Sequence, residues 1–524
     1  MRFPRLLKAG WLAAAVALSA SAGAMPEFSF NTADLPEEGR VVLFVPAGGA
    51  LGALGQRLDA TTEGRLARAI EAMEFAGEFG EALSLPALAP FRELVLIGTG
   101  DEPLGARHLH DLGGHAAMSA DDEDGLAIVI DGLSERLDGS VDALGAHLAL
   151  GYALGDYRFT AYKTVEEIED NGTVTLFGAG PSDRQAFEGD LAHVAEGITL
   201  ARDLGSEPGN TLWPQRFVEH VEAAFAGVDG VTFRVLDADA IRGRGMGALM
   251  GVGQGSMHDP RLLVVEYRGA AADQAPIALA GKGITFDTGG ISIKPSENMW
   301  YMKSDLSGAA AVAGVVLAAA KRGADINVVG IMPLAENMPS QDAIRPGDVL
   351  TSMSGKTVEI MSTDAEGRLL LLDAVHYAQV EYQPRLLLNI ATLTGSAMRA
   401  TGPEYAAVIT RDMALSLEMM EIGKTAGEDV WPLPLHPNHY KKIESLIADI
   451  KNTGGDPGAS IGAAVIGTFV AEDLPWIHLD IAGVDWRDEA TPTAPIGHAG
   501  WGVRFMDTLL RKEEQQARSA AQGL

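Results

Sequence analysis

Short β-rich runs alternate with helical segments along this chain, and that alternation limits the fold more than any other feature of the sequence. From Arg40 to about Gly180, apolar and β-branched runs are separated by segments with a helical pattern, such as residues 65–75. The β-rich runs are residues 41–45, 93–97, 126–130 and 173–177. Strands and helices in alternation are typical of an α/β domain built around a largely parallel sheet.

The second half of the chain repeats the pattern. Residues 276–281, 284–286 and 326–331 are predicted strands, and residues 305–321 and 365–380 are predicted helices. The helix over 305–321 is rich in Ala and ends before Gly323, so Asp305 is expected where that helix starts. Asp364, Glu366 and Arg368 are expected at or near the first turn of the helix over 365–380, next to a loop that can face a cleft.

A helical segment at residues 186–204 leads into a stretch that contains Pro and Gly, residues 205–214, which is the candidate passage between two domains. The chain has 524 residues, and roughly 150 residues per domain would allow two large domains or three ordinary ones. We expect two α/β domains. The smaller comprises residues 25–195, and the larger comprises residues 196–524 with a mixed, mainly parallel sheet flanked by helices.

The amino terminus has the order of features of a secretory signal peptide. Arg2, Arg5 and Lys8 precede an apolar run at residues 11–18, and residues 22–24 (AGA) have the small-x-small form of a cleavage site. No other stretch is expected to be apolar over a length sufficient to span a membrane. Residues 1–24 are therefore predicted to be a signal peptide and the mature protein to be periplasmic or secreted; without a signal at 1–24, it would be cytoplasmic.

Charge and cysteine content exclude several classes of function. The formal net charge is −31, which makes nucleic acid an unexpected partner because nucleic-acid binding depends on basic surfaces. The chain has no cysteine, which excludes disulfides, thiolate metal ligands and Cys nucleophiles. This absence is also compatible with an oxidising compartment.

Two short stretches hold carboxylates and cationic side chains at spacings that suit a two-metal hydrolytic centre. They are residues 281–294 (GKGITFDTGGISIK) and residues 362–369 (STDAEGRL). A carboxylate can bridge two divalent ions about 3.5 to 4 Å apart, and such a pair can activate one water. The candidate residues are Asp287, Asp305, Asp364 and Glu366, with Lys282, Lys294 and Arg368 among them.

Each of these acids has an ordinary structural explanation, such as the end of a strand or the first turn of a helix. Their density within about 80 residues, beside glycines that permit close backbone approach, is not explained in that way. The chain lacks a His-Glu-x-x-His motif, and only His108 and His110 lie close together, where a strand or loop is expected. Oxygen ligands favour Mn²⁺ or Mg²⁺, although Zn²⁺ also accepts carboxylates.

Six ordered motifs resemble those of the leucine (cytosol) aminopeptidase family, over about residues 200–505. They are residues 281–290 (GKGITFDTGG), 337–340 (NMPS), 345–348 (RPGD), 363–369 (TDAEGRL), 391–395 (ATLTG) and 478–483 (HLDIAG). The amino-terminal half matches the family only in its general α/β character. The resemblance implies a metal-dependent aminopeptidase that releases leucine-like and other neutral first residues from short peptides.

The resemblance also implies a role for each matching position. The two ions, Mn²⁺ or Zn²⁺, would be held by Lys282, Asp287, Asp305, Asp364 and Glu366. Lys294 and Arg368 would be catalytic, with a bicarbonate-like anion or a water held by Arg368. A lysine ligand must lose its proton, which adjacent divalent ions promote by lowering its pKa. The substrate would be contacted by Met302, Thr392, Leu393, Gly395 and Ala482. The family further implies a homohexamer.

The chain departs from the family pattern at a few positions. Ser362 stands where Asn is usual, near the substrate pocket, and Ser396 stands where Ala is common. Asp485 lies close to the pocket-forming segment and would disfavour acidic first residues if it faced the pocket, but a surface loop is the expected position. Ser362 therefore bears on side-chain preference and not on metal binding.

Two other functions fit part of the pattern. A two-metal phosphoesterase could use the same carboxylates, but the ordered peptidase motifs count against it. A non-catalytic role, in DNA binding or as a structural protein, is disfavoured by the acidic composition and by the presence of all seven metal and catalytic positions. Hydrolysis of a leucine anilide, compared with hydrolysis of a phosphoester, separates the first two functions.

Overall fold

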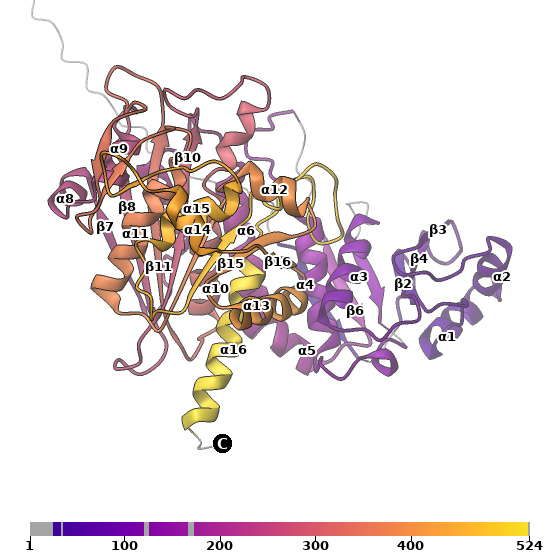
Figure 1. Ribbon diagram of the computed structural model, residues 1–524. Coiled ribbons are helices and arrows are strands. Elements are labelled where there is room, and N and C mark those ends of the chain that lie inside the picture. Colours follow the sequence, from indigo (N-terminus) through magenta and orange to yellow (C-terminus); the bar gives the residue numbers. More distant parts are fainter. Residues whose placement is uncertain (1–24, 33–34, 120–124, 131, 166–171, 522–524) are drawn as a thin grey trace, which may run out of the picture.

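The computed structural model describes residues 25–521, except residues 33–34, 120–124, 131 and 166–171. Figure 1 shows a smaller amino-terminal part beside a larger carboxyl-terminal part, each built around its own sheet. The predicted signal peptide, residues 1–24, lies outside the described residues. The predicted division into two α/β regions, the smaller one first, is confirmed.

The amino-terminal sheet has six strands in the order β1-β6-β5-β2-β4-β3, and only β3 runs antiparallel to its neighbour. The strands are β1 (Glu27–Asn31), β2 (Arg40–Val45), β3 (Ala82–Pro86), β4 (Glu93–Gly98), β5 (Leu126–Val129) and β6 (Thr173–Phe177). The four predicted strands are β2, β4, β5 and β6, with ends that agree to within a residue. They are fully or partly buried, as expected where helices cover both faces.

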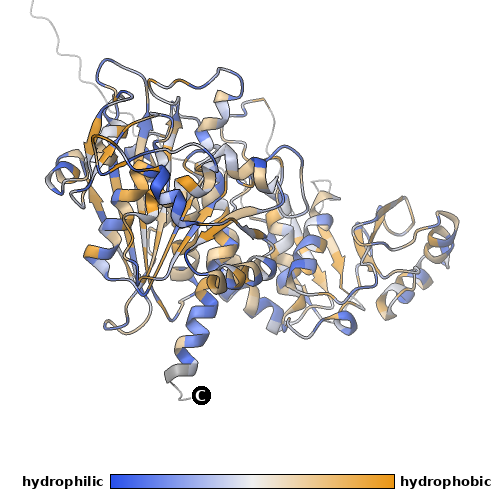
Figure 2. Cartoon of the chain, viewed as in Figure 1, coloured by the Kyte–Doolittle hydropathy of each residue, from blue (hydrophilic) through white to orange (hydrophobic). Residues whose placement is uncertain are grey.

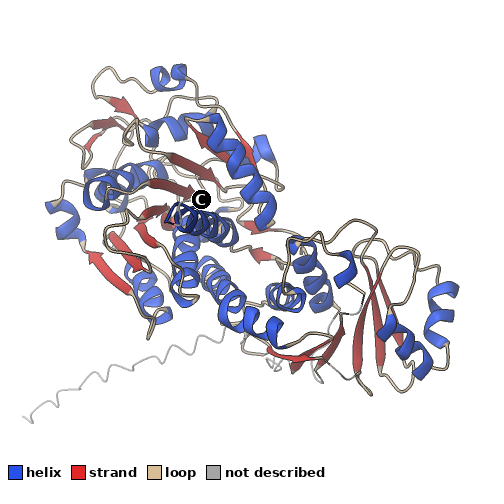
Figure 3. Cartoon of the chain, turned by 90° about the horizontal axis from the view of Figure 1, so that it is seen from below, coloured by secondary structure: helices blue, strands red, loops and turns tan. Residues whose placement is uncertain are grey.

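Strand β2 shows how that burial arises. Val42 and Phe44 pack into one core with α3 (Ala106–Met118) and α4 (Leu144–Asp156). Val41, Leu43 and Val45 point the other way, toward α1 (Ala53–Thr61) and α2 (Arg65–Ala72). Figure 3, seen from below, shows the strands of this sheet between helices on either side. The alternation of side chains along a strand therefore supplies both cores.

The connection between the two regions is one long helical run. It consists of α5 (Pro181–Ala186), a π-helical turn (Phe187–Leu191) and α6 (Ala192–Ser206). The predicted helix over 186–204 is confirmed. Helix α6 packs closely against α10 (Ser307–Lys321), since a Cβ on Gly197 would come within 2.4 Å of the Gly314 carbonyl oxygen. The two glycines let the helices approach each other.

The carboxyl-terminal sheet has nine strands in the order β16-β15-β18-β14-β9-β11-β8-β7, with β10 paired to β11. The strands are β7 (Val231–Leu236), β8 (Arg261–Arg268), β9 (Ile277–Gly281), β10 (Gly283–Asp287), β11 (Asn327–Asn337), β14 (Leu386–Ala391), β15 (Ala406–Thr410), β16 (Val430–Pro432) and β18 (Trp476–Asp480). The central strands β18, β14, β9 and β11 are parallel, whereas β15, β8 and β7 enter antiparallel pairs. The predicted mixed, mainly parallel sheet is confirmed.

Helices cover both faces of this sheet. The core on one face includes α6, α10 and α16 (Val503–Ala521), and the core on the other includes α9 (Gly247–Gly253), α11 (Gly367–Tyr382) and α15 (Gly458–Gly467). Figure 2 shows hydrophobic strands at the centre and a hydrophilic end of α16, which points away from the rest of the chain. The predicted helices are α10 and α11.

The parallel strands place the candidate residues at one edge. Strands β9, β14 and β18 end at Gly281, Ala391 and Asp480, directly before segments that carry predicted site residues. In α/β sheets, ligands bind where parallel strands end. The fold therefore gathers segments that are far apart in sequence at the carboxyl edge of the central strands.

Two expectations are wrong. His108 and His110 lie on helix α3 and not on a strand or loop. His108 Nδ1 accepts a hydrogen bond from the Gly105 amide at the start of α3. Gly113 packs closely against the Leu148 carbonyl of α4, so tertiary contacts also stabilise this helix.

The second wrong expectation is that no other stretch is apolar over a length sufficient to cross a membrane, because Met299–Lys321 has that length and composition. This segment comprises the 3-10 helix η3 (Met299–Ser304) and α10, and 89% of its apolar window is buried inside the fold. The segment has the composition of a membrane helix because α10 is packed on all sides in the core.

Candidate metal centre

Asp287 ends strand β10 with its carboxylate fixed by the chain. Its side chain is buried, and Oδ1 accepts hydrogen bonds from the Gly289 amide and from Asn337 Nδ2, both at 2.8 Å. Asn337 is the residue opposite Asp287 in the pairing of β10 with β11. With Oδ1 held in this way, Oδ2 is the oxygen that faces Lys294, at 2.8 Å from Nζ.

The two motifs are joined by hydrogen bonds through Thr363. The Thr363 hydroxyl donates to the Gly289 carbonyl at 2.6 Å and accepts the Ser292 amide at 2.8 Å. Gly289 has φ +85°, a conformation that favours glycine, and a Cβ there would come within 2.8 Å of Asp364 Oδ1. The loop that ends at Lys294 is therefore placed directly against the loop that holds Asp364.

Lys294 and Lys282 each lie between two carboxylates. Lys294 Nζ is 2.6 Å from Asp364 Oδ1 in addition to its contact with Asp287. Lys282 Nζ is 2.7 Å from Asp305 Oδ1 and 2.8 Å from Glu366 Oε1, and it donates to the Thr392 carbonyl at 2.8 Å. The two lysines thus connect all four candidate acids.

Lys282 fits only because the residue after Glu366 is glycine. A Cβ on Gly367 would come within 2.6 Å of Lys282 Cε and 2.9 Å of its Nζ. Thr392 also donates its hydroxyl proton to Asp305 Oδ1 at 2.6 Å. The predicted metal ligands and Thr392 therefore form one contiguous cluster.

Burial and mutual charge perturb the whole cluster. Burial raises the pKa of Asp287 to about 6, with a further contribution from Glu366, and burial also raises the pKa of Asp305 and Asp364. Burial acts in the same direction on Glu366, but Lys282 and Lys294 outweigh it and lower the pKa of Glu366 to about 2. The surrounding carboxylates raise the pKa of both lysines in spite of burial. Such perturbation is typical of functional sites.

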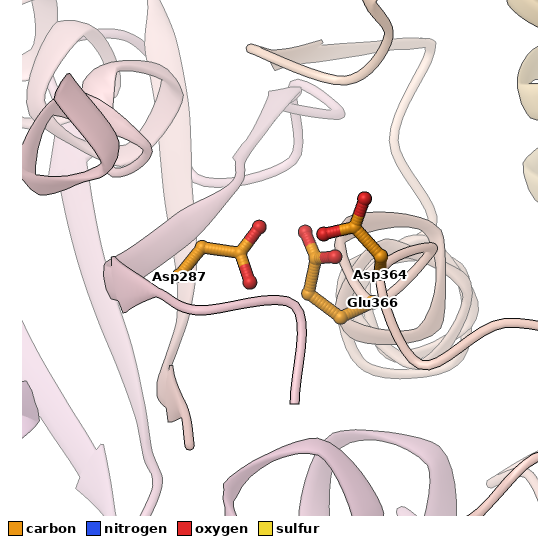
Figure 4. A group of neighbouring side chains, drawn as sticks. All are labelled: Asp287, Asp364 and Glu366. Atoms are coloured by element: carbon orange, nitrogen blue, oxygen red, sulfur yellow. The ribbon is translucent and has the colours of Figure 1, made fainter. Parts of the chain in front are cut away.

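The cluster has the donor set of a metal centre. Oxygen atoms of Asp287, Asp364 and Glu366 lie within 4.8 Å of one another, and Figure 4 shows the three carboxylates converging. Asp305 Oδ2 and Glu366 Oε2 are buried and have no hydrogen-bond partner among the described residues. Buried oxygens without a donor are costly unless a ligand supplies the missing interaction. The residues present therefore fit divalent cations.

Arg368 lies in the first turn of α11, beside Glu366. It is buried, its Nη1 donates to the Asn452 carbonyl at 2.9 Å, and its Nε has no partner among the described residues. Asn452 also holds the second motif, since its Oδ1 accepts the Met361 amide at 2.8 Å and its Nδ2 donates to the Ser362 carbonyl at 2.7 Å. Asn452 was not singled out from the sequence, where nothing local marks it.

Two of the residues predicted to contact substrate, Leu393 and Ala482, are held by a further buried acid, Asp480. Asp480 Oδ1 accepts the amides of Leu393 at 3.0 Å and Ala482 at 3.3 Å, and Asp480 Oδ2 accepts the Thr394 hydroxyl at 2.7 Å. Gly395 follows at the start of α12 (Gly395–Thr401). Asp480 and Asn337 both lie in motifs that resemble the family, at residues 478–483 and 337–340. The family pattern could therefore have marked them as site residues, whereas their side-chain chemistry alone could not.

The expectation that Asp485 lies on a surface loop is wrong. Its side chain is only 6% exposed, and its Oδ2 is 3.1 Å from the Ser307 hydroxyl. Burial raises the pKa of Asp485 to about 7. The partner Ser307 is 178 residues away in sequence, so no local pattern could have predicted this position.

Comparison with known proteins gives the same class throughout. The catalytic domain of the cytosol aminopeptidase family matches residues 199–506, and its N-terminal domain matches residues 41–166. A probable cytosol aminopeptidase of Brucella ovis is 40% identical over 499 residues, covering 93% of this chain and 99% of that protein. One from Dinoroseobacter shibae is 42% identical over 481 residues, covering 91% and 95% respectively.

Solved structures agree with these sequence matches. The bottromycin maturation enzyme BotP in complex with Mn is 30% identical, with a TM-score of 0.79, and covers 91% of this chain and 99% of its own. A point mutant of tomato leucine aminopeptidase is 28% identical, with a TM-score of 0.82, and covers 94% and 97% respectively.

The fold and the acid–lysine centre define a metal-dependent hydrolase of peptide bonds that acts at the amino terminus of its substrates. The chain belongs to the cytosol aminopeptidase family.

Proposed function

We propose that two divalent ions are held by five side chains of the cluster and that the chain uses them to remove the first residue of short peptides. The proposed ligands are Lys282, Asp287, Asp305, Asp364 and Glu366, with Asp287 and Glu366 shared between the ions. The observation that carries the proposal is the pair of lysines, each between two carboxylates, together with the two buried carboxylate oxygens that have no partner among the described residues.

Divalent ions at these ligands would polarise the peptide carbonyl and supply a water of lowered pKa. Manganese or zinc would serve. The oxygen-rich ligand set favours the harder ion, and the structural relative BotP is described with Mn. Lys282 would bind as a neutral amine, so it has to release the proton that the surrounding carboxylates hold in the absence of metals.

Lys294 and Arg368 are the proposed catalytic residues. The Lys294 ammonium stays protonated beside Asp287 and Asp364, so it can donate a hydrogen bond to the carbonyl oxygen of the scissile bond. Arg368 Nε, which has no partner within the described part of the chain, can hold an anion such as bicarbonate, or a water, near Glu366. That anion or water would carry the proton to the leaving amine.

The pocket for the first side chain is proposed to lie between η3 and the segments after β14 and β18. Its residues are Met302, Thr392, Leu393, Gly395 and Ala482. Leucine-like and other neutral side chains match the mainly apolar character of this set. The amide of Asp364 donates to the Ser362 hydroxyl, so Ser362 is tied to a proposed ligand and can shift side-chain preference.

The assembly and the compartment are proposed on separate grounds. The family resemblance supports a homohexamer, which sedimentation of the purified protein can test. Residues 1–24 support export, whereas relatives named cytosol aminopeptidases favour the cytoplasm. Amino-terminal sequencing of the protein isolated from cell fractions decides between the two compartments, because an exported chain would lack residues 1–24.

The decisive experiment measures hydrolysis of a panel of amino-acid anilides after chelation and re-addition of single metals. We expect chelation to abolish turnover and Mn²⁺ or Zn²⁺ to restore it. A phosphoester included in the panel should remain intact. Absence of peptidase activity with every metal would overturn the proposal.

A further inference from the structure

Asp485 lies one turn after Ala482, in the segment that follows β18. The amides of Val484 and Asp485 both donate to the Ile481 carbonyl, at 3.0 and 3.1 Å, so residues 481–485 form a helical turn. Residues three apart in such a turn share a side. Asp485 is therefore next to Ala482, which the proposed function places in the pocket for the first side chain.

The carboxyl group of Asp485 also contacts the opposite side of that pocket. Its Oδ2 is 3.1 Å from the Ser307 hydroxyl, which also donates to the Ser304 carbonyl. Ser304 ends η3, two residues after Met302. Through Ser307, the carboxyl group thus links the segment of Ala482 to the segment of Met302, both of which the proposed function places at the pocket for the first side chain.

The described part of the chain does not supply all the donors that a carboxylate at this position can accept. Gly500 N–H donates to His498 Nδ1 at 3.2 Å, so the proton of neutral His498 is on Nε2 and is donated to Ser307 Oγ at 2.8 Å. The single proton of the Ser307 hydroxyl is then shared between the Ser304 carbonyl and Asp485. Hydrogen-bonding capacity therefore remains on Asp485.

No lysine or arginine among the described residues forms an ion pair with Asp485, although its neighbourhood accommodates cations. Trp486 packs edge-on against Trp300 and Tyr301, with ring centroids 5.6 and 5.1 Å apart. Lys303 Nζ lies 5.6 Å from the Trp486 ring centroid, on the ring face. One ammonium is already stabilised on the face of the aromatic ring that follows Asp485 in sequence.

We propose that Asp485 is a specificity-determining residue that favours peptides whose first residue is lysine or arginine over neutral residues of equal length. A buried carboxyl group without a cation is costly, and an entering ammonium or guanidinium group supplies the missing charge-assisted hydrogen bond. An acidic first residue is disfavoured by like charge. This inference rests on the proposed peptidase function, because that function defines the pocket. It extends the proposed set of neutral first residues to basic ones and ranks the basic ones first.

The wild-type enzyme alone can test it. With the metal-loaded protein, kcat/KM is measured for the anilides of lysine and norleucine, which share a chain length and differ by the ammonium group. We expect lysine to exceed norleucine by about tenfold or more. A norleucine value equal to or above that of lysine overturns the inference while leaving the peptidase function standing. If no anilide is hydrolysed, the proposed function fails and the inference fails with it.

A matched pair of variants separates recognition from structural support. Asp485→Asn should lower the lysine to norleucine ratio by about tenfold. Asp488→Asn is the control, because Asp488 is exposed in the same segment and accepts the Tyr301 hydroxyl at 2.6 Å. It should leave the ratio within about twofold of wild type. An equal loss on both substrates in Asp485→Asn would show that Asp485 only holds Ser307, and would overturn the inference. If Asp485→Asn does not fold, the wild-type ratio decides.

Discussion

The metal centre and the buried Arg202 differ in whether the chain itself satisfies the hydrogen bonds of a charged group in the interior. Arg202 is 2% exposed and donates to three backbone carbonyls, those of Leu154 at 2.7 Å, Thr493 at 2.6 Å and Ala499 at 3.1 Å. Burial lowers its pKa to about 10. In the metal centre, two buried carboxylate oxygens have no donor among the described residues.

The difference separates structural from functional burial. At Arg202 the chain itself satisfies the charge and thereby joins α4, α6 and the segment before α16. At the metal centre the chain holds one oxygen of Asp287 and leaves oxygens of Asp305 and Glu366 open. A buried polar group whose hydrogen-bonding capacity the chain does not satisfy is therefore a better guide to a ligand site than burial or charge alone.

The largest effect is expected from Asp287→Ala, which disrupts the metal centre. Asp287→Ala removes a proposed shared ligand, so bound metal and peptidase turnover should be lost together, turnover by more than about 10³-fold. Metal content by elemental analysis and anilide hydrolysis check this. Asp239→Ala, at an exposed position on α8 (Ala238–Gly243), is the matched control and should change neither. Retention of full metal content by Asp287→Ala would contradict the ligand assignment.

Lys294→Ala sharpens the comparison within the centre. We expect turnover to fall by about 10² to 10³-fold, because a cation aimed at the substrate carbonyl is lost. The metal content should stay at the wild-type level, since Lys294 contacts ligands but is not one. If the metals leave with Lys294, the proposed division between ligands and catalytic cations is wrong.

Arg202→Met tests the opposite member of the comparison. Three carbonyls would lose their donor, so the free energy of unfolding should fall by about 3 kcal/mol. Denaturant unfolding of the metal-loaded protein measures it. Turnover per folded molecule should be retained, because Arg202 contacts none of the predicted site residues. A loss of turnover without a loss of stability would mean that the junction acts on the site.

The smallest expected effect is on the pH dependence of stability, through His498. Burial lowers the pKa of His498 to about 3 in the folded chain. The unfolded chain binds this proton near pH 6.5, so below that pH the unfolded state takes up more protons and stability falls as the pH falls. His498→Gln should reduce the slope of unfolding free energy against pH between pH 6 and 4 by about 1.4 kcal/mol per pH unit. Equal slopes in the two proteins would contradict a neutral buried His498.

Local patterns predicted the strands and helices but not the contacts between distant segments. The apolar runs of β2, β4 and β6 and the position of Asp305 near the start of α10 were predictable from the sequence, because hydrophobic periodicity and turn residues are local. The proposed ligand set was inferred from the family motifs. Asp485 and Asn452 were not predictable, since their partners Ser307 and Ser362 lie 178 and 90 residues away.

The proposed ligands come from the residue after β9, the end of β10 and the segments that precede α10 and α11. Thr363 joins the segment before α11 to the loop after β10. An unfolded chain would present none of them in register, so the ions would bind the folded domain far more tightly than the unfolded one. By mass action, free metal would then raise the melting temperature in proportion to the logarithm of its concentration. The supply of metal in the surroundings would thus set how long each enzyme molecule survives, in addition to how fast it works.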